Sequence, residues 1–304
     1  MEGQQLLVDL DKSRSAMSRI RGLDGATATI EEIKEFLSSV LGGYAVTVPR
    51  FFPGLRLFRA RICEKPTNIR ELMYPPAHLA SQGRANRAGC PMLYCCLARE
   101  APFFESRPPV GSPIVIARWV TTENLIVNHV GYTREAFDQL GSIRTITGWG
   151  NEPVEASFGE PDLEIHRFIS DAFTRPVSAD MIHLYKLPIA IAERLCSDDL
   201  FGGLLYPAVA MKGNADNIAL KPSFADHNLK FVKAEFATIT GFTDFRYEIQ
   251  LHDSATQVGE DGTIHWKNRL DQWILRNQGD ELTFTALNGE WEARDSDGKV
   301  VEPS

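Results

Sequence analysis

Apolar residues recur every three to four positions between Ile30 and Leu41, the spacing of one face of an α-helix. Thr29 followed by Glu32 is a capping-box pattern that begins such a helix, and the glycine pair at 42–43 ends it. The pattern predicts a helix over residues 30–41, inside a helical N-terminal extension that spans residues 1–50.

The central stretch, residues 51–242, mixes strand patterns with helical ones. Alternating residues in the segment 55–62 predict a strand with one apolar face and one face that carries Arg59 and Arg61. Apolar runs and helical spacing predict further elements: strands at 92–98, 113–120, 202–210, 217–223 and 230–240, and helices at 163–173 and 187–196.

The last stretch, residues 243–304, predicts strands at 245–251 and 281–287, with a helix at 268–277 between them. The whole pattern predicts an α+β protein in three parts. These are the N-terminal helical extension, a central domain at 51–242 and a C-terminal β-rich extension.

Composition narrows the classes of function. The chain has 304 residues and a net charge of −8, which argues against a surface for nucleic acid or anionic membranes. The first twelve residues lack the pattern of a signal peptide. Five cysteines without a C-x-x-C pair favour neither a disulfide framework nor a zinc ribbon. We therefore expect a protein of the reducing cytoplasm, without a bound metal.

Common catalytic signatures are missing from the sequence. It has no G-x-G-x-x-G after a strand, no P-loop, no H-E-x-x-H and no G-x-S-x-G. One group of charged and polar residues stands out between positions 59 and 105. It comprises Arg59, the turn Gly83-Arg84-Ala85-Asn86, Tyr94 and Glu105. Arginine forks match phosphate, and a carboxylate can hold sugar hydroxyls, so the group predicts a site for an anionic ligand that carries a sugar.

This part of the sequence resembles the RES-domain family. The resemblance rests on FRARI, the run YPPAHLASQGRANRAGCPMLYCCLAREAPFFESRP, PIVIARW and the late block GGLLYPAVAMKGNADNIALKP, and it spans about residues 51–242. Members resemble ADP-ribosyltransferases in fold and include toxins of bacterial toxin–antitoxin pairs that degrade NAD. The resemblance thus implies a split, twisted sheet flanked by helices.

The resemblance also implies roles. Arg59 and Glu105 match the family's arginine and glutamate, and Tyr94 matches a tyrosine at the nicotinamide end; these three are the candidate catalytic residues. The candidate NAD-binding residues are Arg84, Asn86, Tyr206, Ala208 and Asn217. NAD is the expected substrate, and no further cofactor is implied. An antitoxin or other partner protein and a second copy of the chain remain open as partners.

The chain departs from the family at Ala208, where members carry a serine. Alanine has no side-chain hydrogen-bonding group, so catalysis is expected to be weakened there. Three functions stay open: an NAD glycohydrolase or phosphorylase, a protein ADP-ribosyltransferase, and a nucleotide-binding protein that has lost catalysis.

Overall fold

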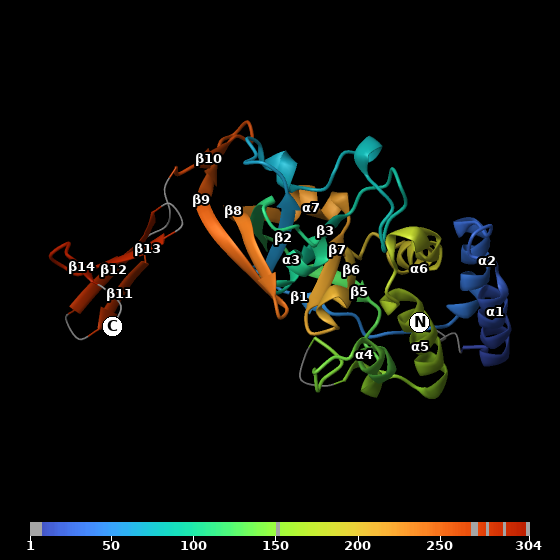
Figure 1. Ribbon diagram of the computed structural model, residues 1–304. Coiled ribbons are helices and arrows are strands. Elements are labelled where there is room, and N and C mark those ends of the chain that lie inside the picture. The colour runs from blue at the N-terminus through green and yellow to red at the C-terminus, as the bar shows by residue number, and fades with distance from the viewer. Residues whose placement is uncertain (1–7, 150–152, 269–272, 278–279, 288–289, 302–304) are drawn as a thin grey trace. The chain divides into compact units, whose positions relative to one another are not determined.

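The structure is a computed structural model that describes residues 8–149, 153–268, 273–277, 280–287 and 290–301 (Figure 1). The fold is α+β, as the sequence predicts. Contacts divide the chain into two compact units. The first comprises Met1–Leu57, Tyr74–Ala101 and Thr121–Leu229, and the second Phe58–Met73, Pro102–Val120 and Lys230–Ser304.

The first unit contains six α-helices in its described part: α1 (Leu10–Gly22), α2 (Ile30–Val40), α4 (Arg134–Leu140), α5 (Glu160–Thr174), α6 (Lys186–Leu195) and α7 (Pro222–Asn228). The predicted start of α2 is confirmed, because the Thr29 hydroxyl accepts a hydrogen bond from the Glu32 amide at 3.1 Å. Buried residues of α1, α2, α5 and α6 share one hydrophobic core, which includes Met17, Leu37 and Phe173.

Five strands of the first unit lie side by side in the order β1 (Arg50–Phe51), β5 (Leu125–His129), β6 (Gly203–Pro207), β7 (Asp216–Leu220) and β3 (Leu93–Cys96). The pair β5–β6 is parallel, and the pairs β6–β7 and β3–β7 are antiparallel. Because β6 pairs with β7, the two halves of the late sequence block face each other, with Tyr206 opposite Asn217.

The second unit contains the strands β2 (Arg56–Ile62, of which Phe58 onward belong here), β4 (Pro113–Thr121), β8 (Leu229–Thr243), β9 (Arg246–Val258) and β10 (Ile264–Trp266), neighbours in this order. Most of the short helix α3 (Ala101–Ser106) also belongs to it. A separate sheet follows, made of β11 (Trp273–Asn277), β12 (Asp280–Leu287), β13 (Glu290–Arg294) and β14 (Val300–Val301).

Two local predictions need correction. The helix expected at 268–277 is wrong where the structure describes it, because residues 273–277 form β11 and pair antiparallel with β12; residues 269–272 lie outside the described part. In β2, the predicted apolar face is only partly covered, since Ile62 is 41% exposed, whereas Leu57, on the face of Arg59 and Arg61, is fully buried. Pairing with a neighbouring strand outweighs the local helical pattern in β11.

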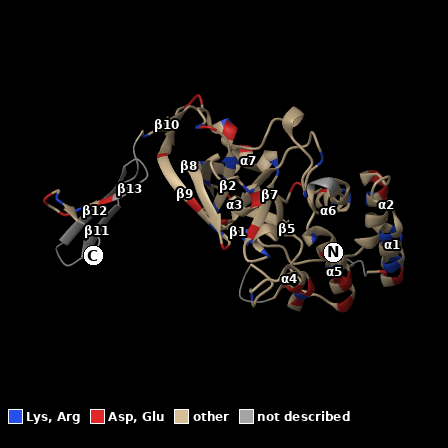
Figure 2. Ribbon diagram, in the orientation of Figure 1, with Lys and Arg blue, Asp and Glu red and all other residues tan. Residues whose placement is uncertain are grey.

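The helices carry mixed charge. Figure 2 shows Lys and Arg together with Asp and Glu on the same helices; α1, for example, has Asp11 in its first turn and Arg19 and Arg21 in its last. Within the described residues, we find no helix with the length and apolar character needed to cross a bilayer.

Candidate functional site

Tyr94 holds the turn that contains Arg84. From β3, its hydroxyl donates a hydrogen bond to Oδ1 of Asn86 at 2.6 Å and accepts one from the Ala85 amide at 2.9 Å. The amide of Gly83 donates to the carbonyl of Asn86 at 3.0 Å, which closes the turn. A Cβ at Gly83 would lie 2.7 Å from both the Tyr94 hydroxyl and Oδ1 of Asn86, so only glycine fits here.

The amide group of Asn86 is consumed inside the turn. Its Nδ2 donates to the carbonyls of Ser81 at 2.9 Å and Arg87 at 2.8 Å, and its Oδ1 receives the Tyr94 hydroxyl. With a residue exposure of 5%, Asn86 therefore shapes the loop rather than presenting its amide to a ligand.

Arg84 is held at the C-terminal end of α5. Its Nη1 donates to the carbonyls of Phe173 and Arg175, and its guanidinium lies 5.9 Å from the ring centre of Phe173 and 5.4 Å from that of Tyr185. Its Nε and Nη2 make no hydrogen bond to the described part of the chain. The turn thus presents a half-buried cation, flanked by aromatic rings, with donors left for an anion.

Tyr206, from the late sequence block GGLLYPAVAMKGNADNIALKP, contacts the Phe173 ring that also lies next to Arg84. Tyr206 is 5% exposed, and its ring meets the Phe173 ring edge-on at 5.1 Å between centres. Asn217 is 4% exposed, and its Oδ1 accepts from Sγ of Cys96 at 3.1 Å. The structure therefore joins Arg84 and Tyr206 around one ring, while Asn217 faces the neighbouring strand.

Ala208 is enclosed. The residue has no exposed surface, and its methyl group packs with Cys96, Ala101 and Ala215. Its backbone is committed as well, since its amide donates to the Ala215 carbonyl at 2.8 Å and its carbonyl accepts from Gly213 at 2.9 Å. A serine hydroxyl at this position would enter an apolar cluster, so the structure offers no open ligand surface at the Ala208 side chain.

The other two candidate catalytic residues belong to the second unit. Arg59 lies on β2, half-buried, and its Nε is shielded from solvent. Glu105 lies on α3 with an exposed side chain. Tyr94 belongs to the first unit, so a single site that contains all three residues stays a prediction.

Aromatic side chains cluster around Phe104, the residue before Glu105, and no pattern in the sequence predicted this. Phe104 stacks on Phe245 at 5.9 Å and meets Tyr247 edge-on at 5.3 Å, while Phe242 lies 4.4 Å from Tyr247 between ring centres. Phe242 is 45% exposed and Phe245 59%. The alternation in 245–251 predicts a strand, but only the β8–β9 hairpin brings Phe242 opposite Tyr247.

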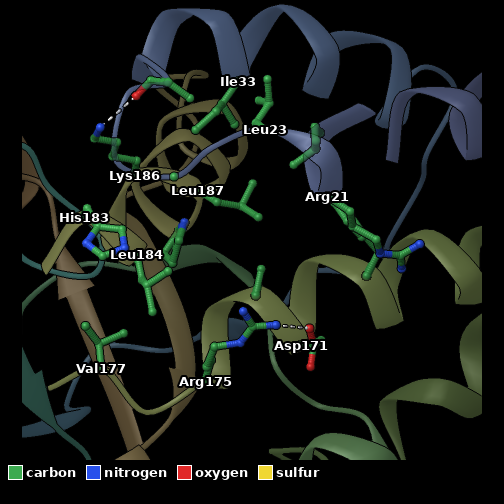
Figure 3. Close-up of a pocket in the computed structure, with 16 residues that line it drawn as sticks. Arg21, Leu23, Ile33, Asp171, Arg175, Val177, His183, Leu184, Lys186 and Leu187 are labelled. Atoms are coloured by element: carbon green, nitrogen blue, oxygen red, sulfur yellow. Dashed lines mark hydrogen bonds and ion pairs between the residues drawn. The ribbon is translucent and has the colours of Figure 1, made fainter. Parts of the chain in front are cut away.

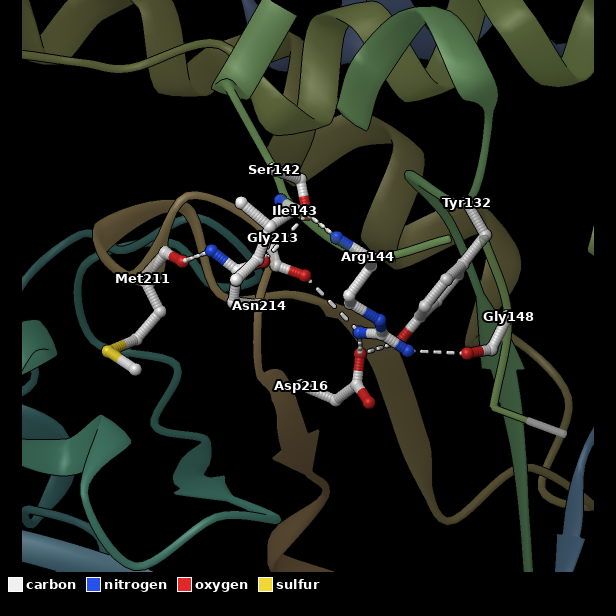
Figure 4. Close-up of polar contacts among 9 residues, drawn as sticks. All are labelled: Tyr132, Ser142, Ile143, Arg144, Gly148, Met211, Gly213, Asn214 and Asp216. Carbon is white, nitrogen blue, oxygen red and sulfur yellow. Dashed lines mark hydrogen bonds and ion pairs between the residues drawn. The ribbon is translucent and has the colours of Figure 1, made fainter. Parts of the chain in front are cut away.

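A polar network fixes the loop between β6 and β7 (Figure 4). Nη1 of Arg144 donates to Oδ1 of Asp216 at 2.8 Å, the Tyr132 hydroxyl donates to the same oxygen at 2.9 Å, and Nη2 of Arg144 donates to the Gly148 carbonyl at 2.5 Å. Complete burial and the nearby Asp216 carboxylate raise the pKa of Tyr132 well above its ordinary value. Tyr132 therefore stays a neutral donor. No sequence motif marked these residues.

Two fully buried histidines lie next to each other in the first unit. The rings of His129 and His166 are 5.4 Å apart between centres. The Tyr44 hydroxyl lies 2.8 Å from Nδ1 of His166, and Nε2 of His129 lies 3.1 Å from the Thr47 carbonyl oxygen. Burial lowers the pKa of each to about 3, so both are neutral at pH 7. The described residues contain no cluster of three metal-ligating side chains.

In comparisons with known proteins, no protein-family model and no curated protein matches the chain.

Proposed function

We propose that the protein binds NAD and cleaves the bond between nicotinamide and ribose, as a glycohydrolase or a phosphorylase on an ADP-ribosyltransferase-like fold. The observation that carries the proposal is the arrangement around Arg84. A turn locked by Tyr94 presents a cation between two aromatic rings, with N–H groups left for an anion. A pyrophosphate next to flat rings matches this chemistry.

In this proposal two arginines act on the negative charge of the substrate and one carboxylate acts on its developing positive charge. Arg84 and Arg59 neutralise the pyrophosphate, and Glu105 binds the ribose hydroxyls and stabilises the positive charge that develops on the ribose carbon. Nicotinamide leaves with the electron pair of the broken bond. An oxygen of water or phosphate then bonds to the same carbon and, in the case of water, loses its proton to solvent. Tyr94 acts as a positioning residue, because its hydroxyl is used by the turn.

The alanine at position 208, where the family that the sequence resembles carries a serine, favours a second candidate, a nucleotide-binding protein with weak or no catalysis. That candidate keeps Arg84 and its rings but releases no nicotinamide. A protein ADP-ribosyltransferase is the third candidate, and labelling of a protein band with biotinylated NAD would identify it.

The test is release of nicotinamide from NAD by the purified protein, compared with Glu105→Gln. Loss of the carboxylate charge is expected to lower kcat by roughly a hundred- to thousandfold, the effect of about 3–4 kcal/mol of electrostatic stabilisation. Glu100→Gln, an exposed carboxylate just before α3, is the matched control and should leave kcat unchanged. Equal rates for wild type and Glu105→Gln would remove Glu105 from the mechanism. NAD binding without release in the wild type would favour the binding protein.

We further propose that the protein acts in the cytoplasm as a toxin or defence effector, because NAD is an intracellular metabolite. Induced expression of the wild type should then lower cellular NAD and slow growth, whereas expression of Glu105→Gln should do neither.

A further inference from the structure

A cavity of about 330 Å³ lies in the first unit, between the ends of α1 and α5, the start of α2 and the segment that leads into α6 (Figure 3). It is distinct from the turn at Arg84, since neither Arg84 nor Tyr94 lines it. Its size is at the lower end of the range for small-molecule sites.

The floor of the cavity is apolar and well packed. Ile20, Ile33 and Phe168 line it with residue exposures of 6%, 4% and 7%. Half-buried side chains of Leu184 and Leu187 continue the apolar wall. A ligand in this cavity would therefore place an apolar body against the floor.

The rim is cationic. The guanidinium of Arg21 lies 5.1 Å from the ring centre of Phe168, and Arg175 pairs with Asp171 at 3.0 Å. Nζ of Lys186 donates to the carbonyls of Ala26 and Ala28, both at 2.8 Å, which ties the loop after α1 to the start of α6.

The lining thus contains three cations and one carboxylate, with His183 in addition. Asp24, near His183 and Lys186, is a further carboxylate outside the lining, and hydrogen bonds from the Ala26 amide and the Thr27 hydroxyl hold it. The lining itself carries more positive than negative charge, and Glu164, a carboxylate near Arg21, is held by Arg14 in an ion pair at 2.8 Å.

We propose that this cavity binds an amphipathic anion, a small molecule with an apolar body and one carboxylate or phosphate group. The apolar body lies on Ile20, Ile33 and Phe168, and the anionic group lies at the rim beside Arg21 and Arg175. Guanidinium groups bind either kind of anion with paired hydrogen bonds, so the headgroup is the part that the experiment identifies. The site does not depend on NAD chemistry.

Titration calorimetry of the full chain with octanoate, octyl phosphate and octanol tests the proposal. We expect the better of the two anions to bind about tenfold tighter than octanol, the gain of roughly one charge-assisted hydrogen bond. The tighter anion identifies the headgroup. Arg21→Ala should remove most of this preference. Arg19→Ala, an exposed arginine on the same helix whose guanidinium lies over the Phe36 ring, should keep it.

Ala172→Phe fills the cavity from α5 and should abolish binding of all three probes, with circular dichroism used to verify that the variant is folded. If it unfolds, Leu187→Trp fills the cavity from α6 instead. Equal affinity for octanol and both anions, no binding of any probe to the wild type, or unchanged binding in a folded filled variant would each overturn the proposal.

Discussion

The hydroxyl of Tyr94 lies 2.6 Å from Oδ1 of Asn86 and 2.9 Å from the amide nitrogen of Ala85, so one oxygen closes the turn that presents Arg84. Tyr94→Phe removes both hydrogen bonds and leaves partly buried polar groups without partners. We expect the free energy of unfolding to fall by about 1–3 kcal/mol, measured by urea denaturation.

Tyr74→Phe is the matched control for that substitution. The Tyr74 hydroxyl donates its single proton to an exposed carboxylate, that of Asp226, whose two oxygens both lie 2.8 Å away. Water replaces these contacts, so the loss should stay below about 1 kcal/mol. If the two variants lose equal stability, the Tyr94 hydroxyl has no special role in the turn.

Arg59→Ala should weaken substrate binding. The pyrophosphate charge is present in the ground state and in the transition state, so KM for NAD is expected to rise while kcat changes less. One charge-assisted hydrogen bond corresponds to a rise of roughly 10- to 150-fold. Arg61→Ala on the same strand is the control, because its guanidinium bonds the Glu71 carbonyl and is exposed. A large effect in kcat alone would contradict the binding role of Arg59.

Ala208→Ser should reduce stability and should not increase nicotinamide release. The hydroxyl would enter the apolar cluster of Cys96, Ala101 and Ala215, where an unpaired polar group costs about 1–3 kcal/mol. Thermal unfolding and nicotinamide release measured on the same preparation test both statements. A serine variant that is more active than the wild type would mean that this side chain reaches the substrate.

Elements with strong local signals could be predicted from the sequence. Thr29 and the spacing that follows it predicted α2, and the apolar runs predicted β3 and β4. The helix expected at 268–277 failed because β11 is formed by pairing with β12, and a partner strand leaves no mark on the local sequence.

The candidate site could be predicted only as a set of residue types. The sequence marks Tyr94 and Asn86 as separate ligand groups, whereas their hydrogen bond depends on how the turn folds back over β3. Arg144 and Asp216 are 72 positions apart, so no motif could connect them. Pairs of this kind depend on tertiary packing, which spacing along the chain does not encode.

Asp216→Asn should loosen the loop between β6 and β7. The substitution removes the charge that Arg144 and the Tyr132 hydroxyl share. Both members of the ion pair are mostly buried, and we expect a loss of about 1–3 kcal/mol, less than for a fully buried pair because solvent screens it in part. Tyr132→Phe removes a single neutral donor and should cost less. Proteolysis of the 208–215 loop provides a second measurement, and unchanged cleavage in Asp216→Asn would contradict the role assigned to the network.

Acid should destabilise the protein through His129 and His166. Burial lowers the pKa of each to about 3 from 6.5, so below pH 6.5 the unfolded chain binds protons that the folded chain does not. Stability is therefore full above about pH 6.5 and falls as the pH drops toward 3, by up to about 1.4 kcal/mol per pH unit for each histidine. Urea denaturation between about pH 5 and 6.5, above the range where carboxyl groups titrate, measures the slope. His166→Gln should halve it and His78→Gln, at an exposed position, should leave it unchanged; a slope that is equal in all three proteins would show that the buried pair does not control acid stability.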